Sequence, residues 1–456
     1  MVPLSQVSLI FACGTALFSD GYVNSVIGTV VTILQRKFGS SVITTNEHTT
    51  LNSIGFAGTI VGMITFGYLT DKFGRKFGMM SATGIIILFS FLSACSQGVH
   101  GSTHGLLIAL IVFRFFLGIG IGAEYPCGSV AASEQSEEEQ IAKYSQNRWL
   151  ALATSEFEFR IVHMQPSYPI LDTMIDFGFV IGSFVPLVLW WIFGDKHLNA
   201  VWRGTLGFGI IPSSVVFIWR LRMREPKRYR EDGMKHAVIP YGLVIRRYWS
   251  SLAAISIVCL FASTILNSVE PAGVSFAAVL GWNTVINLFD MPGTILGAFA
   301  VDYLGPKKTL CWGLGIQGVV GFILAGTYPM LKNHVAGFAI MYGVFLSLGE
   351  FGPGNCTIIL AAKTGPTAIR GHYYGIAAAV GKVGALVGTQ ALLSLIISIL
   401  FVHPLSTDGM IEEDKAFREY LIENGYDVSK MGLQDEESDS VSSIKEYKEK
   451  EDFVTA

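Results

Sequence analysis

The chain has 456 residues, of which 51% are hydrophobic and only 15% are charged. Soluble proteins average about 25% charged residues, so this composition argues against an ordinary soluble globular fold. The formal net charge of −3 is uninformative by itself, because the charges are unevenly distributed along the chain.

Long apolar segments follow one another through most of the sequence. A run of about 20 residues can cross a bilayer as a helix, and about 11 spans are readable by this criterion. The first span holds Asp20 and is too long for the apolar core of a cleavable signal peptide. We therefore predict an all-α membrane protein with spans near 5–34, 48–70, 77–97, 105–131, 170–194, 200–220, 249–269, 277–301, 309–330, 335–361 and 372–403.

A short cationic turn, GYLTDKFGRK at 67–76, joins the second and third predicted spans. A related turn, DYLGPKK at 302–308, occupies the matching place in the second half, and such repetition is typical of a duplicated helical transporter. The acid of the first turn can pair with a basic group or a helix N-terminus across the repeat interface. An ordinary positive-inside loop is the alternative. We expect a conformational latch formed by Gly67, Asp71, Gly74, Arg75 and Lys76.

Basic residues gather in the turn at 71–76, in the central segment and in later loops of the same parity. Because cytosolic loops carry the excess of Lys and Arg, the N-terminus and the central linker are predicted to be cytosolic. The linker could also bind anionic lipid. Nucleic-acid binding does not explain the flanking apolar spans. The predicted parts are an N-terminal transmembrane half (1–222), a cytosolic basic linker (223–245), a C-terminal transmembrane half (246–403) and a polar tail (404–456).

The polar tail contains an acidic run at 434–440 and a mixed charged run at 445–452. Sequence of this kind cannot bury enough apolar surface to fold alone, so we predict disorder, with a short surface helix at Glu412–Tyr426.

The six cysteines all fall in apolar segments and form no CxxC pair, so no structural disulfide and no metal site are predicted. The sequence also shows no nucleophile–base or metal constellation. We therefore predict a protein that is not an enzyme and has no cofactor.

Ionisable residues inside the predicted spans carry the functional argument. A charge at bilayer depth is costly and usually faces a cavity or a partner. Any one of them could form a structural ion pair, but so many of both signs predict a polar central cavity. A carboxylate there can exchange protons, and a lysine offers a compact cation to an anionic substrate. The residues are Asp20, Arg114, Glu124, Asp176, Asp290, Glu350 and Lys382.

Several segments of the chain resemble segments of the major facilitator superfamily. The turn at 67–76 matches the signature loop of that superfamily. The segment Arg114–Ser129 resembles the fourth helix of its phosphate:proton symporter branch. The segment Phe18–Val30 is similar to the first helix of fungal glycerophosphoinositol permeases, and 175–180 and 381–385 are similar to other segments of those permeases.

The resemblance implies a fold of about 12 spans in two pseudo-symmetric halves. It implies proton-coupled uptake of a glycerophosphodiester such as glycerophosphoinositol, or of inorganic phosphate, by a monomer in the plasma membrane. It implies proton coupling for Asp20 and Glu124, and substrate binding for Tyr125 and Lys382.

Further candidate cavity residues are Asp290, Glu350 and Asn355. Asp290 can supply a carboxylate in place of the family's seventh-span acid, which is missing here. The alternative for Asp290 is a helix-kink acid beside Pro292.

The chain also departs from the family's pattern. Residues 150–172 look like an additional stretch, Lys363 stands where an acid is usual, and no clear twelfth span follows 403. Two other functions remain open: a facilitator of a sugar or polyol, against which Lys382 argues, and a non-transporting nutrient sensor or inactive truncated paralogue.

Overall fold

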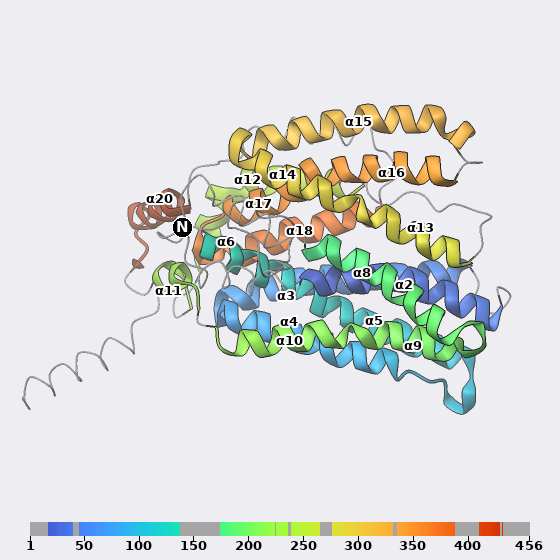
Figure 1. The fold of residues 1–456 in the computed structure, drawn as a ribbon. Helices are drawn as coiled ribbons and strands as arrows, with labels where there is room; N and C mark the ends of the chain where they lie inside the picture. Colours follow the sequence, from blue (N-terminus) through green and yellow to red (C-terminus); the bar gives the residue numbers. More distant parts are fainter. Residues whose placement is uncertain are drawn as a thin grey trace, which may run out of the picture.

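Figure 1 shows the computed structural model as a bundle of helices that run side by side. The structure describes residues 17–39, 45–136, 174–223, 225–235, 239–264, 276–331, 335–387, 410–428 and 431. These residues contain helices and no β-strand. Nine helical segments among them are long and apolar enough to cross a membrane. The predicted all-α membrane fold is confirmed.

The first half forms one layer of the bundle, drawn in blue to green in Figure 1. The elements of the first half are α2 (Leu17–Phe38), α3 (Thr45–Phe73), α4 (Arg75–Ala94), η1 (Val99–Gly101), α5 (Thr103–Glu124), η2 (Tyr125–Ser129), α6 (Val130–Ser136), α8 (Met174–Phe193), η4 (Asp195–His197), α9 (Leu198–Phe208) and α10 (Ile210–Leu221). The long helix α5 continues through the π-helical turn η2 into α6, and α9 and α10 together form one span.

The second half forms the other layer, drawn in yellow-green to orange. Its elements are α12 (Tyr241–Thr264), α13 (Phe276–Leu288), α14 (Asp290–Leu304), α15 (Pro306–Leu331), α16 (Val335–Gly349), η5 (Glu350–Gly354), α17 (Asn355–Lys363), η6 (Thr367–Ile369) and α18 (Arg370–Val387). Two short helices lie together at one end of the bundle: α11 (Lys227–Asp232) from the linker and α20 (Met410–Glu423) from the predicted tail.

The predicted spans and the helices agree closely in order and position. α12 begins at Tyr241, earlier than the 249 expected for the seventh span, because the helix continues beyond the apolar run into charged residues. The start of the first predicted span (5–16), the additional stretch at 150–172, the end of the seventh span and residues 388–409 lie outside the described residues.

Glycines allow α3 and α5 to pack with their backbones in contact. A Cβ atom added at Gly58 would lie 2.0 Å from the Phe115 carbonyl oxygen, and one added at Gly122 would lie 2.1 Å from that of Thr59. Any larger residue would force the helices apart, which is why small residues mark such interfaces in membranes.

Both repeated turns depend on a glycine in a left-handed conformation. Gly74 alone separates α3 from α4 and has a φ of 116°. Gly305 alone separates α14 from α15 and has a φ of 79°. Side chains rarely adopt this region of φ, so glycine permits each abrupt reversal. The reversal makes the joined helices antiparallel neighbours, as the short turns predict.

Candidate functional site

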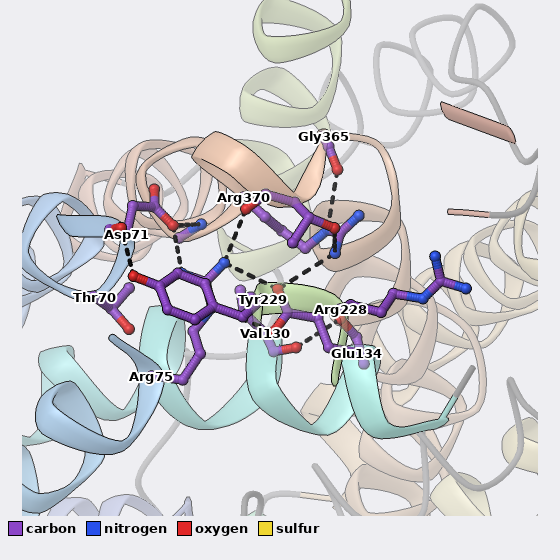
Figure 2. Close-up of polar contacts among 12 residues, drawn as sticks. Thr70, Asp71, Arg75, Val130, Glu134, Arg228, Tyr229, Gly365 and Arg370 are labelled. Atoms are coloured by element: carbon purple, nitrogen blue, oxygen red, sulfur yellow. Dashed lines mark hydrogen bonds and ion pairs between the residues drawn. The ribbon is translucent and has the colours of Figure 1, made fainter. Parts of the chain in front are cut away.

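The end of the bundle that carries the turn at 67–76 holds a buried network of charges, which we call the charged end. Its members come from both halves and from α11 and α20: Asp71, Arg75, Glu134, Tyr229, Arg370 and Asp414. Figure 2 shows most of them around the guanidinium groups.

Asp71, in the last turn of α3, binds the other half of the molecule. Its carboxylate accepts hydrogen bonds from the backbone nitrogens of Gly371 at 2.9 Å and His372 at 2.7 Å, in the first turn of α18. It also pairs with Arg75. The contact expected for this acid, at a helix N-terminus across the repeat interface, is therefore present; its part in a conformational change stays a prediction.

Arg75 lies at the centre of the charged end with no exposed surface. Its Nη2 lies 2.9 Å from Glu134 Oε1 and donates to the Thr367 carbonyl at 3.1 Å. Its guanidinium stacks 4.7 Å from the centre of the Tyr229 ring. Because a buried cation needs both charge and hydrogen-bond partners, this arrangement holds Arg75 in one position.

Glu134, at the end of α6, connects the two halves through a second arginine. Its Oε1 lies 3.4 Å from Arg370 Nη1, and both side chains are fully buried. Arg370 also donates to the Gly365 carbonyl at 3.0 Å and to the Thr367 hydroxyl at 2.7 Å. One carboxylate of the first half is thus shared between arginines of both halves.

The helix α20 closes over the charged end. Asp414 accepts hydrogen bonds from the backbone nitrogen of Thr367 at 2.7 Å and from its hydroxyl at 2.6 Å. It also lies 3.7 Å from both Arg228 and Arg370. Phe417 and Leu421 of the same helix are buried. A surface helix was expected at 412–426; the structure places α20 at 410–423 and packs it against the bundle.

Glu225, in the linker, caps the N-terminus of α4. It accepts hydrogen bonds from the backbone nitrogens of Arg75 at 3.0 Å and Lys76 at 3.1 Å. A Cβ atom at Gly74 would lie 2.4 Å from the Glu225 carboxylate, so the glycine also makes room for the cap. Burial raises the pKa of Glu225, although the two hydrogen bonds and the Arg75 charge act in the opposite direction.

Sequence reasoning missed five residues of this end: Glu134, Glu225, Tyr229, Arg370 and Asp414. A signal existed for Glu134 and Arg370, because the predicted topology puts both on the same side of the membrane as the basic turn at 67–76. For the other three, neither the periodicity nor the spacing of the sequence indicated a contact with residues 71–76.

The two residues expected to bind substrate lie together, and each comes from a different half. Lys382 Nζ of α18 donates to the Tyr125 hydroxyl of η2 at 3.2 Å and lies 5.0 Å from the centre of its ring. The Phe56 ring of α3 lies 5.9 Å from the same nitrogen. Among the described residues no carboxylate forms an ion pair with Lys382. The arrangement presents a cation beside a phenol where the halves meet.

Glu124 does not share this place with its neighbour Tyr125. Its carboxylate pairs with Arg220 of α10, with both oxygens 2.8 Å from Nη1, and accepts a hydrogen bond from Thr83 at 2.9 Å. Glu124 and Arg220 have no exposed surface. Arg114, also buried, donates to the Val23 carbonyl at 3.1 Å. Glu124 therefore has a fixed cationic partner inside the first half.

The candidate cavity residues lie together in the second half. Asp290 begins α14, Glu350 begins η5, and Asn355 begins α17. The Asn355 amide donates to the carbonyls of Glu350 at 3.0 Å and Thr294 at 2.9 Å. Asp20 lies on α2, but its side chain is outside what the structure describes.

The remaining turn residues lie where the halves meet or at the rim. A Cβ atom at Gly67 would lie 2.8 Å from the Gly371 carbonyl oxygen, so α3 and α18 cross closely there. Lys76 donates to the Leu221 carbonyl at 2.8 Å and so fixes α10 to α4.

Comparison with known proteins assigns the fold to a family. The Major Facilitator Superfamily model matches residues 13–151, and the Sugar (and other) transporter model matches 243–403. The chain is 40% identical to a glycerophosphocholine permease of Candida albicans over 97% of its own length and 88% of that protein. The chain belongs to the major facilitator superfamily. Within that superfamily, the chain belongs to the family of glycerophosphodiester permeases that includes the glycerophosphocholine permease.

Other members and solved structures agree with this assignment. The major glycerophosphoinositol permease of C. albicans is 38% identical over 92% of this chain and 83% of that protein. A proton:xylose symporter bound to a bromodeoxyglucose has a TM-score of 0.64 at 14% identity, covering 94% of this chain and 92% of that one. That likeness shows the major facilitator fold. This permease family member is thus an integral membrane transporter.

Proposed function

We propose that this chain is a symporter that takes up a glycerophosphodiester together with protons by alternating access. The observation that carries the proposal is the Lys382 ammonium, which lies beside the Tyr125 hydroxyl where the two halves meet. A phosphodiester carries one negative charge and oxygen acceptors that suit this cation and a nearby hydroxyl. An uncharged sugar would leave the lysine without a counter-charge.

The named relatives support the same substrate class, since three of them are glycerophosphocholine, glycerophosphodiester and glycerophosphoinositol transporters. More distant relatives, such as an inorganic phosphate transporter of Toxoplasma gondii at 26% identity, share the phosphate group. We propose that substrate recognition rests on the phosphate, with the attached alcohol selecting among diesters.

We propose further that the protein resides in the plasma membrane. Its charged end faces the cytosol. The excess of Lys and Arg in its loops supports this orientation. In the structure the charged end is closed by contacts between the halves, through Asp71, Glu134 and Arg370. Transport would then require these contacts to break when the cytosolic side opens.

Uptake by the purified protein in liposomes tests this proposal. With an inward proton gradient we expect radiolabelled glycerophosphocholine or glycerophosphoinositol to accumulate, and a proton ionophore to abolish the accumulation. Equilibration without accumulation indicates a facilitator. Preferential uptake of xylose contradicts the substrate class, and no uptake of any of these compounds indicates a sensor or an inactive paralogue.

A further inference from the structure

Three carboxylates interact electrostatically where α8 of the first half packs against the second half. Asp176 comes from α8 of the first half, whereas Asp290 of α14 and Glu350 of η5 come from the second. The helix α14 packs against both α8 and η5. Each of the three carboxylates lies within electrostatic range of the other two. Only 4% of Asp176 and 7% of Asp290 is exposed, so water screens these charges poorly.

A chain of hydrogen bonds joins the Asp176 carboxylate to α14 and η5 across the interface. The Thr294 hydroxyl of α14 donates to Asp176 Oδ2 at 2.6 Å. The Thr294 carbonyl accepts a hydrogen bond from the Asn355 amide at 2.9 Å, and the same amide group donates to the Glu350 carbonyl. Asp176 is therefore linked to the elements that carry the other two acids.

Two buried acceptors at this place lack a hydrogen-bond donor within the described part of the chain. They are Asp290 Oδ1 and the side-chain oxygen of Asn355, a residue that is 1% exposed. An acceptor that is buried without a donor is costly. A carboxylate that takes up a proton becomes a hydroxyl donor, so a proton at this place removes part of that cost.

No described cation balances Asp290 or Glu350. The helices α13 and α16 contain no Asp, Glu, Lys or Arg, and α8 contains Asp176 alone. On α14 the other charged residue is Asp302, near its far end, and the lysines of α15 lie in its first turn. Tyr342 of α16 is the further titratable group that interacts with Asp290. Like charges out of water favour a shared proton over full ionisation.

We propose that Asp176, Asp290 and Glu350 hold the coupling proton of this transporter between the two halves. The inference rests on the proposed function, because it names the groups through which protons drive uptake. Among the described residues no three acids, histidines or cysteines are grouped closely enough to hold one metal ion.

The position of the cluster explains how a proton can bias the conformation. When a proton is bound, repulsion between α8 and the second half is reduced and the Thr294–Asp176 contact is retained. When the proton leaves to water, the repulsion between Asp176 and the two acids opposite it favours separation of α8 from α14. The proton thus binds one arrangement of the halves more tightly than the other, as coupling requires.

Two assays in liposomes separate coupling from transport. The first measures accumulation of labelled glycerophosphodiester under an inward proton gradient, and the second measures exchange of labelled for unlabelled substrate at equal pH on both sides. The variants are Asp290→Asn and Glu350→Gln, which keep the size but cannot ionise, and Asp290→Glu, which can. Asp195→Asn is the control, since Asp195 lies beyond the other end of α8, is exposed, and pairs with Arg36.

We expect Asp290→Asn and Glu350→Gln to reduce gradient-driven accumulation by about tenfold while exchange continues. Asp290→Glu should retain part of the accumulation, and Asp195→Asn all of it. The inference is overturned if Asp290→Asn and Glu350→Gln accumulate substrate as the unaltered protein does, or if correctly inserted variants lose exchange in parallel. If the unaltered protein itself does not respond to the gradient, the proposed function fails instead.

Discussion

The Asp71 carboxylate lies 2.9 Å from the Gly371 backbone nitrogen, so the last turn of α3 is bound to the first turn of α18. Free backbone N–H groups and the helix dipole make a helix N-terminus a favourable place for a carboxylate. Asp71 therefore binds the second half through two backbone N–H groups and not through a cationic side chain of that half. The contact has to break whenever the halves separate at the charged end.

Replacing Asp71 by asparagine should weaken closure of the charged end. The amide keeps the size of the side chain but leaves Arg75 with one charged partner fewer, and breaking a buried ion pair costs about 3–5 kcal/mol. A cysteine introduced by His372→Cys reports opening through its rate of reaction with a membrane-impermeant maleimide. We expect faster labelling with Asp71→Asn. Asp195→Asn, which removes an exposed pair worth about 0–1 kcal/mol, should leave the rate unchanged; equal rates in all three proteins would refute the latch.

Lys382→Ala should abolish measurable uptake of the glycerophosphodiester without preventing insertion. A hydrogen bond to a charged group contributes about 1.5–3 kcal/mol, which corresponds to a loss of affinity of roughly 10–150-fold. Tyr125→Phe is the matched control: it removes only the hydroxyl that accepts from Lys382. We expect that variant to lose about 0.5–1.5 kcal/mol of binding. Normal substrate affinity in an inserted Lys382→Ala protein removes Lys382 from the substrate site.

Glu124→Gln should chiefly destabilise the first half. The variant leaves the fully buried Arg220 without its counter-charge, at a cost of about 3–5 kcal/mol. Thermal unfolding of the detergent-solubilised protein measures the effect, and Thr83→Val, which removes one hydrogen bond to Glu124, should cost about 1 kcal/mol. An unchanged melting temperature together with lost proton-driven accumulation would instead favour the coupling role that the resemblance implies for Glu124.

Asp414→Ala should detach α20 from the charged end. The change removes the acceptor of both Thr367 hydrogen bonds. It also removes one ion-pair partner from each of Arg228 and Arg370. Hydrogen exchange of the backbone amides at 413–423 measures docking, and we expect markedly faster exchange in the variant. Glu419→Ala, on the same helix and without a described ion pair, is the control. Slow exchange in Asp414→Ala would show that burial of Phe417 and Leu421 suffices to hold the helix.

Glu225 should make the stability of the charged end depend on pH. Its pKa in the folded protein is raised above the unfolded value, so the folded state binds the proton more tightly. The stabilisation from this proton is fully present below the unfolded pKa of about 4.3 and is lost as the pH rises through the raised folded pKa. The melting temperature of the unaltered protein, compared with that of Glu225→Gln, should therefore fall with rising pH in this window. A difference that is constant or increases with pH contradicts the sign.

Sequence patterns predicted the helices because each span is long, apolar and ended by local signals. The short turns at 67–76 and 302–308, which contain Gly74 and Gly305, mark the reversals. These signals depend on neighbouring residues or on one small side chain, so they can be read without the fold. The buried charges were also visible, because an ionisable residue inside an apolar run needs a partner wherever the helix lies.

The partners themselves were decided by the tertiary structure. Hydropathy indicates that a helix crosses the membrane, but it does not indicate how the helix is rotated about its own axis. That rotation decides whether Glu124 faces Lys382 or Arg220. The same holds for Asp176, which meets Asp290 and Glu350 because α8 packs against α14. The sequence alone determined a duplicated bundle with costly internal charges. Only the packing of helices distant in the chain decided which of those charges neutralise one another and which lie where the two halves meet.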